Sequence, residues 1–182
     1  MNVEEPELLK RLTNPATQQE AFAVLVNRYT EPLYRQIRRM VLTHDDANDV
    51  LQNTFMKAWQ GLEHFEGRSK LSTWLYRIAV NESLTFLRSR EQEKNHSGSS
   101  DDPTIAQQLL ADEYFDGDEI AAQLQEAIQT LPPVQRHVFQ LHYFEEMKFS
   151  EISDILGTTE GALKASYHLA TKKISDFFKN ID

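Results

Sequence analysis

The chain has 182 residues and a formal net charge of −9 at pH 7, and its composition, 40% hydrophobic and 26% charged, is typical of a globular protein with one or two small domains. The absence of cysteine excludes disulfides, thiolate nucleophiles and cysteine-based zinc sites. We expect a cytoplasmic protein without membrane insertion, because the N-terminus MNVEEPELLKR is acidic and polar and no run approaches the roughly 18 to 20 apolar residues of a membrane span.

The first predicted helical region carries apolar residues that are spaced for one buried side. They are Phe22, Leu25, Val26, Tyr29, Leu33, Ile37, Met40 and Val41. Pro32 lies within this region and predicts either the start of a new helical segment or a kink.

A second helix is predicted in THDDANDVLQNTFMKAWQGL, with Thr43 or Asp45 as its N-cap. Its inward stripe is Ala47, Leu51, Phe55, Ala58 and Leu62. Four polar residues are left at the surface, namely Asp46, Asp49, Gln52 and Asn53. Two interpretations stay open from the pattern alone. Either the acids only suit the positive end of the helix dipole, or this face binds a partner.

The loop EHFEGRSK leads into a third long helix, LSTWLYRIAVNESLTFLRSR, with Ser72 as its expected N-cap. The loop and the polar stripe of the helix place cations near aromatic rings. The residues concerned are Phe65, Arg68, Lys70, Trp74, Arg77, Asn81, Thr85 and Arg88. This combination favours single-stranded DNA, because phosphates attract cations and unstacked bases need flat apolar partners. The alternative is that both aromatic rings simply belong to the core.

Negative charge is concentrated in the middle of the chain. Residues 1–95 hold 13 Lys+Arg and 13 Asp+Glu, residues 96–120 hold none and 7, and residues 121–182 hold 6 and 8, giving 0, −7 and −2. We therefore predict an all-α fold of two small helical domains, 1–95 and 118–182, joined by an acidic flexible linker at 96–117. The linker is interpreted either as a solubilising tether or as a segment that lies in a basic channel of a partner.

The stretch from Leu131 to Phe178 predicts a helical hairpin followed by a helix-turn-helix. Gly157 supplies the turn, and Thr158 or Thr159 is the expected N-cap of the last helix. The apolar stripe of that helix is Leu163, Tyr167, Ala170, Ile174 and Phe177, and the outward face carries Gly161, Lys164, Ala165, His168, Lys172 and Lys179. This outward face either reads a DNA groove or is the solvated side of an ordinary bundle.

Two blocks of the sequence resemble the extracytoplasmic-function (ECF) subfamily of the sigma-70 family, the small two-domain alternative sigma factors of bacterial RNA polymerase. The segments DDANDVLQNTFMKAW and STWLYRIAVNESLTFLR are similar to region two, and LQEAIQTLPPVQRHVFQLHYFEEMKFSEISDILGTTEGALKAS resembles region four. The residues that carry the resemblance are Asp46, Ala47, Asp49, Gln52, Phe55, Trp59, Trp74, Leu75, Ile78, Ala79, Asn81 and Arg88 in the first block, and Leu131, Pro132, Arg136, Glu151, Ile152, Leu156, Gly157 and Gly161 in the second.

The resemblance implies an initiation factor that performs no catalysis and needs neither cofactor nor metal. Region two would bind the clamp coiled coil of the polymerase largest subunit through Asp46, Asp49, Gln52 and Asn53, and the polymerase flap is a further expected contact. Region two would also capture the non-template strand of the minus-ten element and flip a base into a pocket. The residues implied in that capture are Phe65, Arg68, Lys70, Trp74, Arg77, Asn81 and Arg88.

Region four would read the minus-thirty-five duplex with the last helix. The residues implied there are Thr159, Glu160, Lys164, Ala165, His168, Lys172 and Lys173. Many relatives carry a Gly-Thr-Val-Arg-Ser-Arg run at this place, whereas this chain has the run from Gly161 to Ser166 without arginine. Fewer guanidiniums mean fewer bidentate contacts to guanine, so we expect low affinity of the isolated protein for duplex DNA.

Two other classes of protein remain as alternatives. A conventional helix-turn-helix regulator with an N-terminal sensing or dimerisation domain would not need the region-two block. A helical hydrolase using His137, His142, Glu145 and Glu146 is disfavoured, because the sequence contains no nucleophile elbow, phosphate loop or metal pair. The resemblance further implies a free monomer and, as a candidate partner, an anti-sigma factor held between the two domains.

Overall fold

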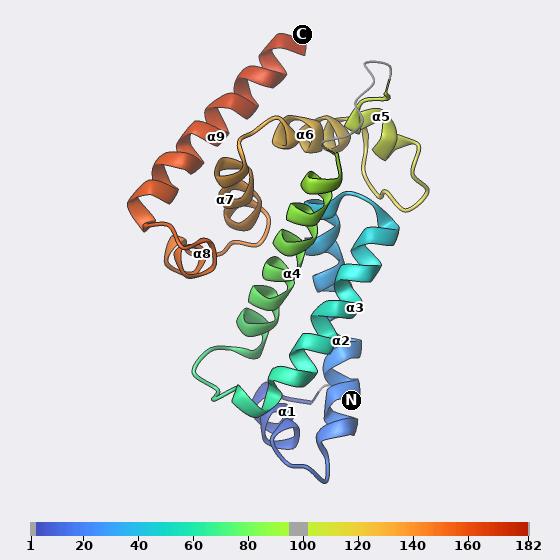
Figure 1. Ribbon diagram of the computed structural model, residues 1–182, viewed down its shortest axis with the longest axis vertical. Coiled ribbons are helices and arrows are strands. Elements are labelled where there is room, and N and C mark those ends of the chain that lie inside the picture. The colour runs from blue at the N-terminus through green and yellow to red at the C-terminus, as the bar shows by residue number, and fades with distance from the viewer. Residues whose placement is uncertain (1–2, 95–101, 182) are drawn as a thin grey trace. The chain divides into compact units, whose positions relative to one another are not determined.

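The computed structural model describes residues 3–94 and 102–181, and every regular element in those ranges is a helix, as the sequence predicts (Figure 1). The chain divides into two compact units, Met1–Glu93 and Lys94–Asp182, which we call unit 1 and unit 2. None of the described helices is both long enough and apolar enough to cross a lipid bilayer. Within the described ranges, His, Asp and Glu side chains form no group of three or more that could hold a metal ion.

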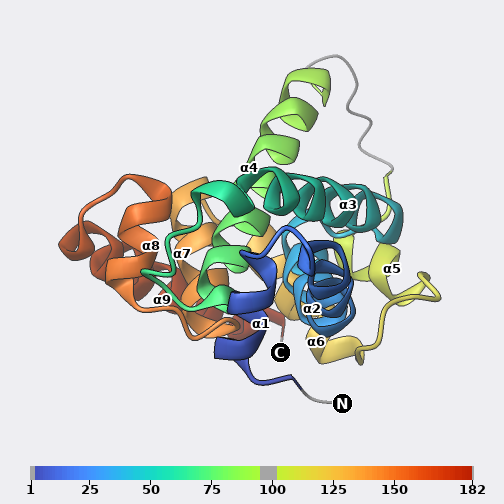
Figure 2. The ribbon, with the colours of Figure 1, turned by 90° about the horizontal axis from the view of Figure 1, so that it is seen from below.

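Unit 1 is built on two long neighbouring helices that pack side by side, α2 and α3 (Figure 1 and Figure 2). Its elements are α1 (Glu5–Leu12), α2 (Gln18–Val41), α3 (His44–Gly61), the 3-10 helix η1 (Leu62–His64) and α4 (Leu71–Lys94). Helix α2 continues through Pro32, so this proline does not begin a new segment. One face of α2 is buried on both sides of the proline, with Leu25 before it and Leu33 and Ile37 after it. Burial of that continuous apolar face offsets the missing backbone hydrogen bond.

Two helix starts in unit 1 have a side-chain cap, that of α3 from a local residue and that of α4 from a distant one. Thr43 is the N-cap of α3 and accepts the Asp46 N–H at 3.3 Å, which confirms one of the two predicted caps. The prediction of Ser72 as the cap of α4 is wrong, because α4 begins one residue earlier and Ser72 lies inside its first turn. The Leu71 N–H donates instead to Oε1 of Glu5 on α1, at 2.9 Å across 66 residues of sequence.

Unit 2 contains a five-helix arrangement in its described part. Its elements are α5 (Ile105–Leu110), α6 (Glu119–Gln129), α7 (Pro133–Tyr143), α8 (Phe149–Leu156) and α9 (Glu160–Ile181). Its main core joins α6, α7 and α9 through Ala127, Ile128, Leu131, Phe139, Ala170 and Ile174. Gly157 takes φ 67° between α8 and α9, a left-handed conformation that glycine adopts without a steric penalty. The turn between α8 and α9 therefore agrees with the predicted helix-turn-helix.

Part of the stretch predicted as a flexible linker is helical. Residues 95–101 lie outside the described residues, but α5 follows within the predicted range 96–117. Thr104 and Gln107 form a capping box at its start, and the Ala106 N–H donates to Glu126 Oε2 on α6 at 3.1 Å. Ala106 and Leu109 are buried against α6. Because the acidic composition masked these apolar residues, the sequence predicted a tether where a short helix packs.

Candidate functional site

An aromatic pair links the loop after η1 to the start of α4. The rings of Phe65 and Trp74 lie 4.7 Å apart between centroids, tilted by 38°, and both side chains are half-buried. A Cβ at Gly61 would stand 3.3 Å from Cζ2 of Trp74, so the glycine allows the indole to lie close to the end of α3. The pair is therefore neither a buried core contact nor a freely exposed platform.

Cationic and polar side chains lie in the same loop and along α4. Arg68, Lys70, Asn81 and Arg88 are exposed, while Arg77 on α4 is half-buried. In the loop, Arg68 forms an ion pair with Glu66 at 2.7 Å, with both side chains exposed. Pairs of this kind are screened by water and contribute little to stability, so Arg68 can exchange its carboxylate for a phosphate at small cost.

A cavity of about 360 Å³ opens beside the pair. Its lining residues are Lys57, Gly61, His64, Trp74, Ile78, Asn81 and Glu82. Lys57 Nζ lies 3.1 Å from Glu82 Oε1, which places a donor and an acceptor side by side at the cavity. The sequence analysis predicted Trp74 and Asn81 here but not Lys57, His64 or Glu82. Lys57 and Glu82 lie 25 positions apart on different helices, and no local pattern connects them.

The four residues predicted to bind polymerase are not equivalent in the structure. Asp49, Gln52 and Asn53 are exposed on α3, whereas Asp46 is half-buried. One Asp46 carboxylate oxygen accepts the Thr43 hydroxyl at 2.6 Å, and the other pairs with Arg90 on α4 at 2.8 Å. Asp46 therefore has partners within unit 1, and three of the four side chains present a free outer surface.

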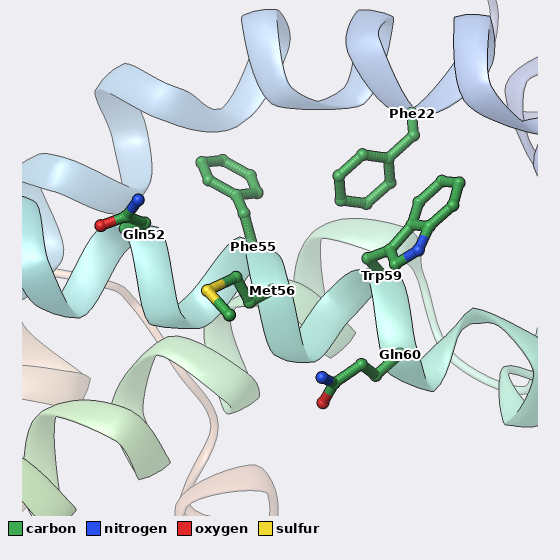
Figure 3. A pocket seen from close by; sticks show the side chains of 6 residues that line it. All are labelled: Phe22, Gln52, Phe55, Met56, Trp59 and Gln60. Atoms are coloured by element: carbon green, nitrogen blue, oxygen red, sulfur yellow. The ribbon is translucent and has the colours of Figure 1, made fainter.

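An apolar groove lies between α2 and α3, next to Gln52 (Figure 3). It has a volume of about 410 Å³ and is lined by Phe22, Gln52, Phe55, Met56, Trp59 and Gln60. The Phe22 ring points toward Trp59, with ring centroids 5.0 Å apart and planes at 73°. Met56 and Trp59 are 55% and 43% exposed, and because they lie together in one groove they form a continuous apolar patch. Periodicity placed Phe22 and Phe55 in the core and gave no sign that they line a groove.

In unit 2 the residues predicted to read DNA lie just before α9 and along it, with Lys173 on the side of the helix opposite Lys164. All seven predicted residues are exposed: Thr159, Glu160, Lys164, Ala165, His168, Lys172 and Lys173. Thr159 Oγ1 accepts the Ala162 N–H at 3.3 Å and so begins the helix, as one of the two predicted caps. Gly161 has no heavy atom within 4 Å of the place where a Cβ would stand, so another molecule can approach the backbone there closely.

The opposite face of α9 is anchored in the helix-turn-helix core. Leu163 and Ala170 are fully buried, and the Tyr167 ring stacks 5.9 Å from Phe139. His142 Nδ1 lies 2.9 Å from the Met147 carbonyl oxygen, and its ring stacks on Phe149 at 4.3 Å. Burial raises the pKa of Tyr167, and the nearby Tyr143 raises it further. The exposed face of α9 is thus held mainly by apolar packing on the other side of the helix, and of its polar residues Lys164 contacts this core, with Nζ 6.0 Å from the centre of the Phe149 ring.

These features define a class of protein: a two-unit helical DNA-binding protein that combines a helix-turn-helix with a second surface rich in aromatic rings and cations. The sigma-70 region 2 family model matches residues 25–93, and the sigma-70 region 4 model matches residues 121–174. The chain is 32% identical over 160 residues to the ECF RNA polymerase sigma factor SigW of Bacillus subtilis, covering 82% of this chain and 84% of that protein. It is 29% identical over 170 residues to the RNA polymerase sigma-H factor of Pseudomonas aeruginosa, covering 85% and 84%. The chain belongs to the ECF subfamily of the sigma-70 family.

Solved structures agree with this fold. CnrH, in complex with the cytosolic domain of CnrY, has a TM-score of 0.67 at 21% identity and covers 98% of this chain and 99% of its own. RpoE of Bartonella quintana, in complex with the anti-sigma factor NepR, also has a TM-score of 0.67 at 23% identity, covering 87% and 96%. The protein is an alternative sigma factor that directs RNA polymerase to promoters, a non-enzymatic initiation factor whose partners are the polymerase and promoter DNA.

Proposed function

We propose that unit 1 acts as region two, which binds core polymerase and captures an unpaired minus-ten base, and that unit 2 acts as region four, which binds the minus-thirty-five duplex. The acidic stretch 96–117 joins them. One observation carries the minus-ten assignment: an aromatic pair, exposed cations and a cavity of about 360 Å³ meet at the loop and α4. A surface of this composition favours single-stranded over duplex DNA, because it offers a stacking partner that paired bases cannot use.

The minus-ten contacts divide by chemistry. Phe65 and Trp74 offer ring surfaces to unstacked bases, and Arg68, Lys70 and Arg88 attract the phosphates. Asn81 borders the cavity and carries both a donor and an acceptor for a base edge. Binding of an extruded base offsets the few kcal/mol of unpairing, so the DNA opens without any covalent step.

Polymerase binding is assigned to the outer surface of α3. Asp49, Gln52 and Asn53 supply polar contacts, and the groove at Phe55, Met56 and Trp59 supplies a neighbouring apolar anchor. Interfaces of this kind draw most of their binding energy from a few large apolar side chains within a polar rim. Asp46 acts indirectly in this scheme, since its carboxylate already holds Arg90.

Duplex binding by α9 relies mainly on phosphate contacts. Lys164, His168, Lys172 and Lys173 can reach the backbone, Thr159 and Glu160 lie at the helix start, and Ala165 can contact a thymine methyl. Because no arginine occupies this face, the isolated protein should bind its promoter duplex weakly at physiological salt. A fluorescence-anisotropy titration that gave tight, sequence-specific binding without polymerase would contradict this assignment.

In vitro transcription with core polymerase and sequencing of the RNA ends tests the proposal as a whole. The holoenzyme should produce discrete start sites downstream of a shared pair of sequence elements, and core enzyme alone should not. Random starts in the presence of the factor would refute the promoter-reading roles of both units. A template lacking only the upstream element then separates the contribution of unit 2 from that of unit 1.

We also propose that the factor works in the cytoplasm, as a monomer when free, and that an anti-sigma protein controls it. The support is that two solved proteins of the same fold are complexes, RpoE with the anti-sigma factor NepR and CnrH with the cytosolic domain of CnrY. Light scattering on the purified chain should give the mass of one chain. A protein that co-purifies with the factor should prevent its binding to core polymerase, and failure of every co-purified protein to do so would argue against this control.

A further inference from the structure

Helix α1 lies outside the segment of this chain that matches region two, residues 25–93, yet it reaches the minus-ten loop. The Glu5 carboxylate on α1 accepts the backbone N–H of Leu71, the first residue of α4, at 2.9 Å. Leu71 directly follows the loop that carries Phe65, Arg68 and Lys70. A single side chain from a remote helix therefore fixes the point where this loop becomes a helix.

The environment of Glu5 suits this task. The first N–H groups of a helix have no partner within the helix, and the positive end of the helix dipole favours a carboxylate. Helix α1 is fixed to the bundle because Leu8 and Leu12 are buried. Glu5 itself is half-buried, and its charge adds to burial in raising the pKa of Tyr29.

The capped turn continues directly into the aromatic pair. The backbone N–H of Trp74 donates to the Lys70 carbonyl oxygen at 3.1 Å. Trp74 therefore belongs to the same first turn of α4 that Glu5 caps, and that turn positions its indole. Within the loop, Gly67 takes φ 69°, and no other described residue of the loop has a positive φ. The loop is thus held by a left-handed glycine in its middle and by the capped helix at its end.

We propose that Glu5 is a positioning residue for minus-ten capture: it fixes the first turn of α4, and through that turn it aligns Trp74 and the loop from Phe65 to Lys70. This inference rests on the proposed function of unit 1. Without the carboxylate, the Leu71 N–H loses its partner, and the first turn can unwind into the loop. The loop and indole then sample several arrangements, and the captured base meets its contacts less often.

The test compares Glu5→Ala and Glu5→Gln with Glu7→Ala, which removes an exposed carboxylate from the same helix. Each variant is assembled with core polymerase, and two affinities are measured: that of the factor for core enzyme and that of the holoenzyme for a single-stranded minus-ten oligonucleotide. Glu5→Ala should weaken oligonucleotide binding about tenfold and leave core binding unchanged. Glu5→Gln keeps an acceptor oxygen and should lie between the wild type and Glu5→Ala, while Glu7→Ala should match the wild type.

A spectroscopic readout separates positioning from simple destabilisation. The chain has two tryptophans, so a Trp59→Phe background leaves Trp74 as the only one, and this readout uses the free chain because Trp59 lies in the groove proposed to bind polymerase. In that background, Glu5→Ala should shift the Trp74 emission to longer wavelength and reduce its response to the oligonucleotide, at temperatures far below unfolding. Equal losses of core binding and oligonucleotide binding would make Glu5 a purely structural residue and overturn the inference.

Two further outcomes complete the test. Identical oligonucleotide affinities for Glu5→Ala and Glu7→Ala would overturn the inference and leave the proposed function of unit 1 intact. A wild-type holoenzyme with no preference for the minus-ten strand over an unrelated strand would overturn both.

Discussion

The two proposed DNA contacts of this factor are built in different ways. The surface in unit 1 combines the end of α3, a loop and α4, its two aromatic rings are half-buried and pack on each other, and its helix cap comes from α1. The surface in unit 2 consists of α9 and the residue before it, and its seven predicted residues are all exposed. In the first, the side chains proposed to bind DNA also pack against each other. In the second, binding and packing are assigned to opposite faces of one helix.

This difference has a mechanistic consequence. A site that captures a flipped base needs a cavity, and a cavity needs several elements held in register, so changes there affect folding and binding together. A site that reads a duplex needs only a rigid helix with exposed side chains, because the DNA supplies the groove. Substitutions should therefore couple stability to function in unit 1 and separate them in unit 2.

The largest effect is expected where α9 of unit 2 meets its core. Leu163→Ala should lower the free energy of unfolding by about 3 kcal/mol, because Leu163 is fully buried in the helix-turn-helix. Leu169→Ala on the same helix is the matched control, since Leu169 is 46% exposed and should cost little. Thermal unfolding of unit 2 reports both values. Equal losses of unfolding free energy in the two variants would mean that the exposed face of α9 contributes to stability as much as the buried face.

A smaller loss of stability with a large loss of function is expected for Trp74→Ala. The half-buried indole packs on Phe65, so its removal should cost about 2 kcal/mol and reduce promoter opening more than tenfold. Trp59→Ala provides the comparison, because Trp59 lies in the groove on α3. That variant should weaken core binding and leave binding of a minus-ten strand by saturated holoenzyme unchanged. If Trp59→Ala impaired binding of the minus-ten strand and Trp74→Ala impaired core binding, the roles proposed for the two surfaces would have to be exchanged.

The Asp46–Arg90 ion pair should contribute at most about 1 kcal/mol. Asp46 is 17% exposed but Arg90 is 47% exposed, so water screens the pair. A double-mutant cycle with Asp46→Asn and Arg90→Gln measures the coupling through urea unfolding. The pair Asp176–Lys179, at 4.0 Å and more exposed, is the control and should show no measurable coupling. A coupling of several kcal/mol would show a stronger internal role for Asp46 than exposure allows.

The smallest change in stability is expected for the exposed lysines of α9. Lys164→Ala and Lys172→Ala should each change the free energy of unfolding by less than about 0.5 kcal/mol. Each should nevertheless weaken binding of promoter duplex by the holoenzyme and lower the slope of log affinity against log salt by about 1. Lys10→Ala in unit 1 should change neither quantity. Large destabilisation by either α9 substitution would contradict the contrast between the units.

The same contrast explains which parts could be predicted from the sequence. The exposed face of α9, its cap at Thr159 and the turn at Gly157 depend on spacing within about twenty residues, so periodicity and local hydrogen bonding were enough. The capped start of α4 depends on Glu5, 66 residues away, and local reasoning selected Ser72 instead. No pattern within one helix indicates such a contact.

Other features were missed for the same physical reason. The groove at Phe22 and Trp59 and the Lys57–Glu82 pair each join two helices that the sequence analysis treated separately. Helix α5 was missed because its few apolar residues lie in a strongly acidic stretch and are buried only against α6. Family resemblance supplied roles for the residues of the matched segments, but it is silent on α1, where the match has not yet begun.

The contact between Glu5 and Leu71 also limits how freely such factors can be recombined. An engineer who exchanges region two between sigma factors would naturally join the pieces at residue 25, where the family match starts. The transplanted segment would then carry α4 without its carboxylate, unless the new host supplies an acid at the same place. For hybrid factors with new promoter preferences, the transferable piece of this chain is therefore not the matched segment alone but that segment together with helix α1.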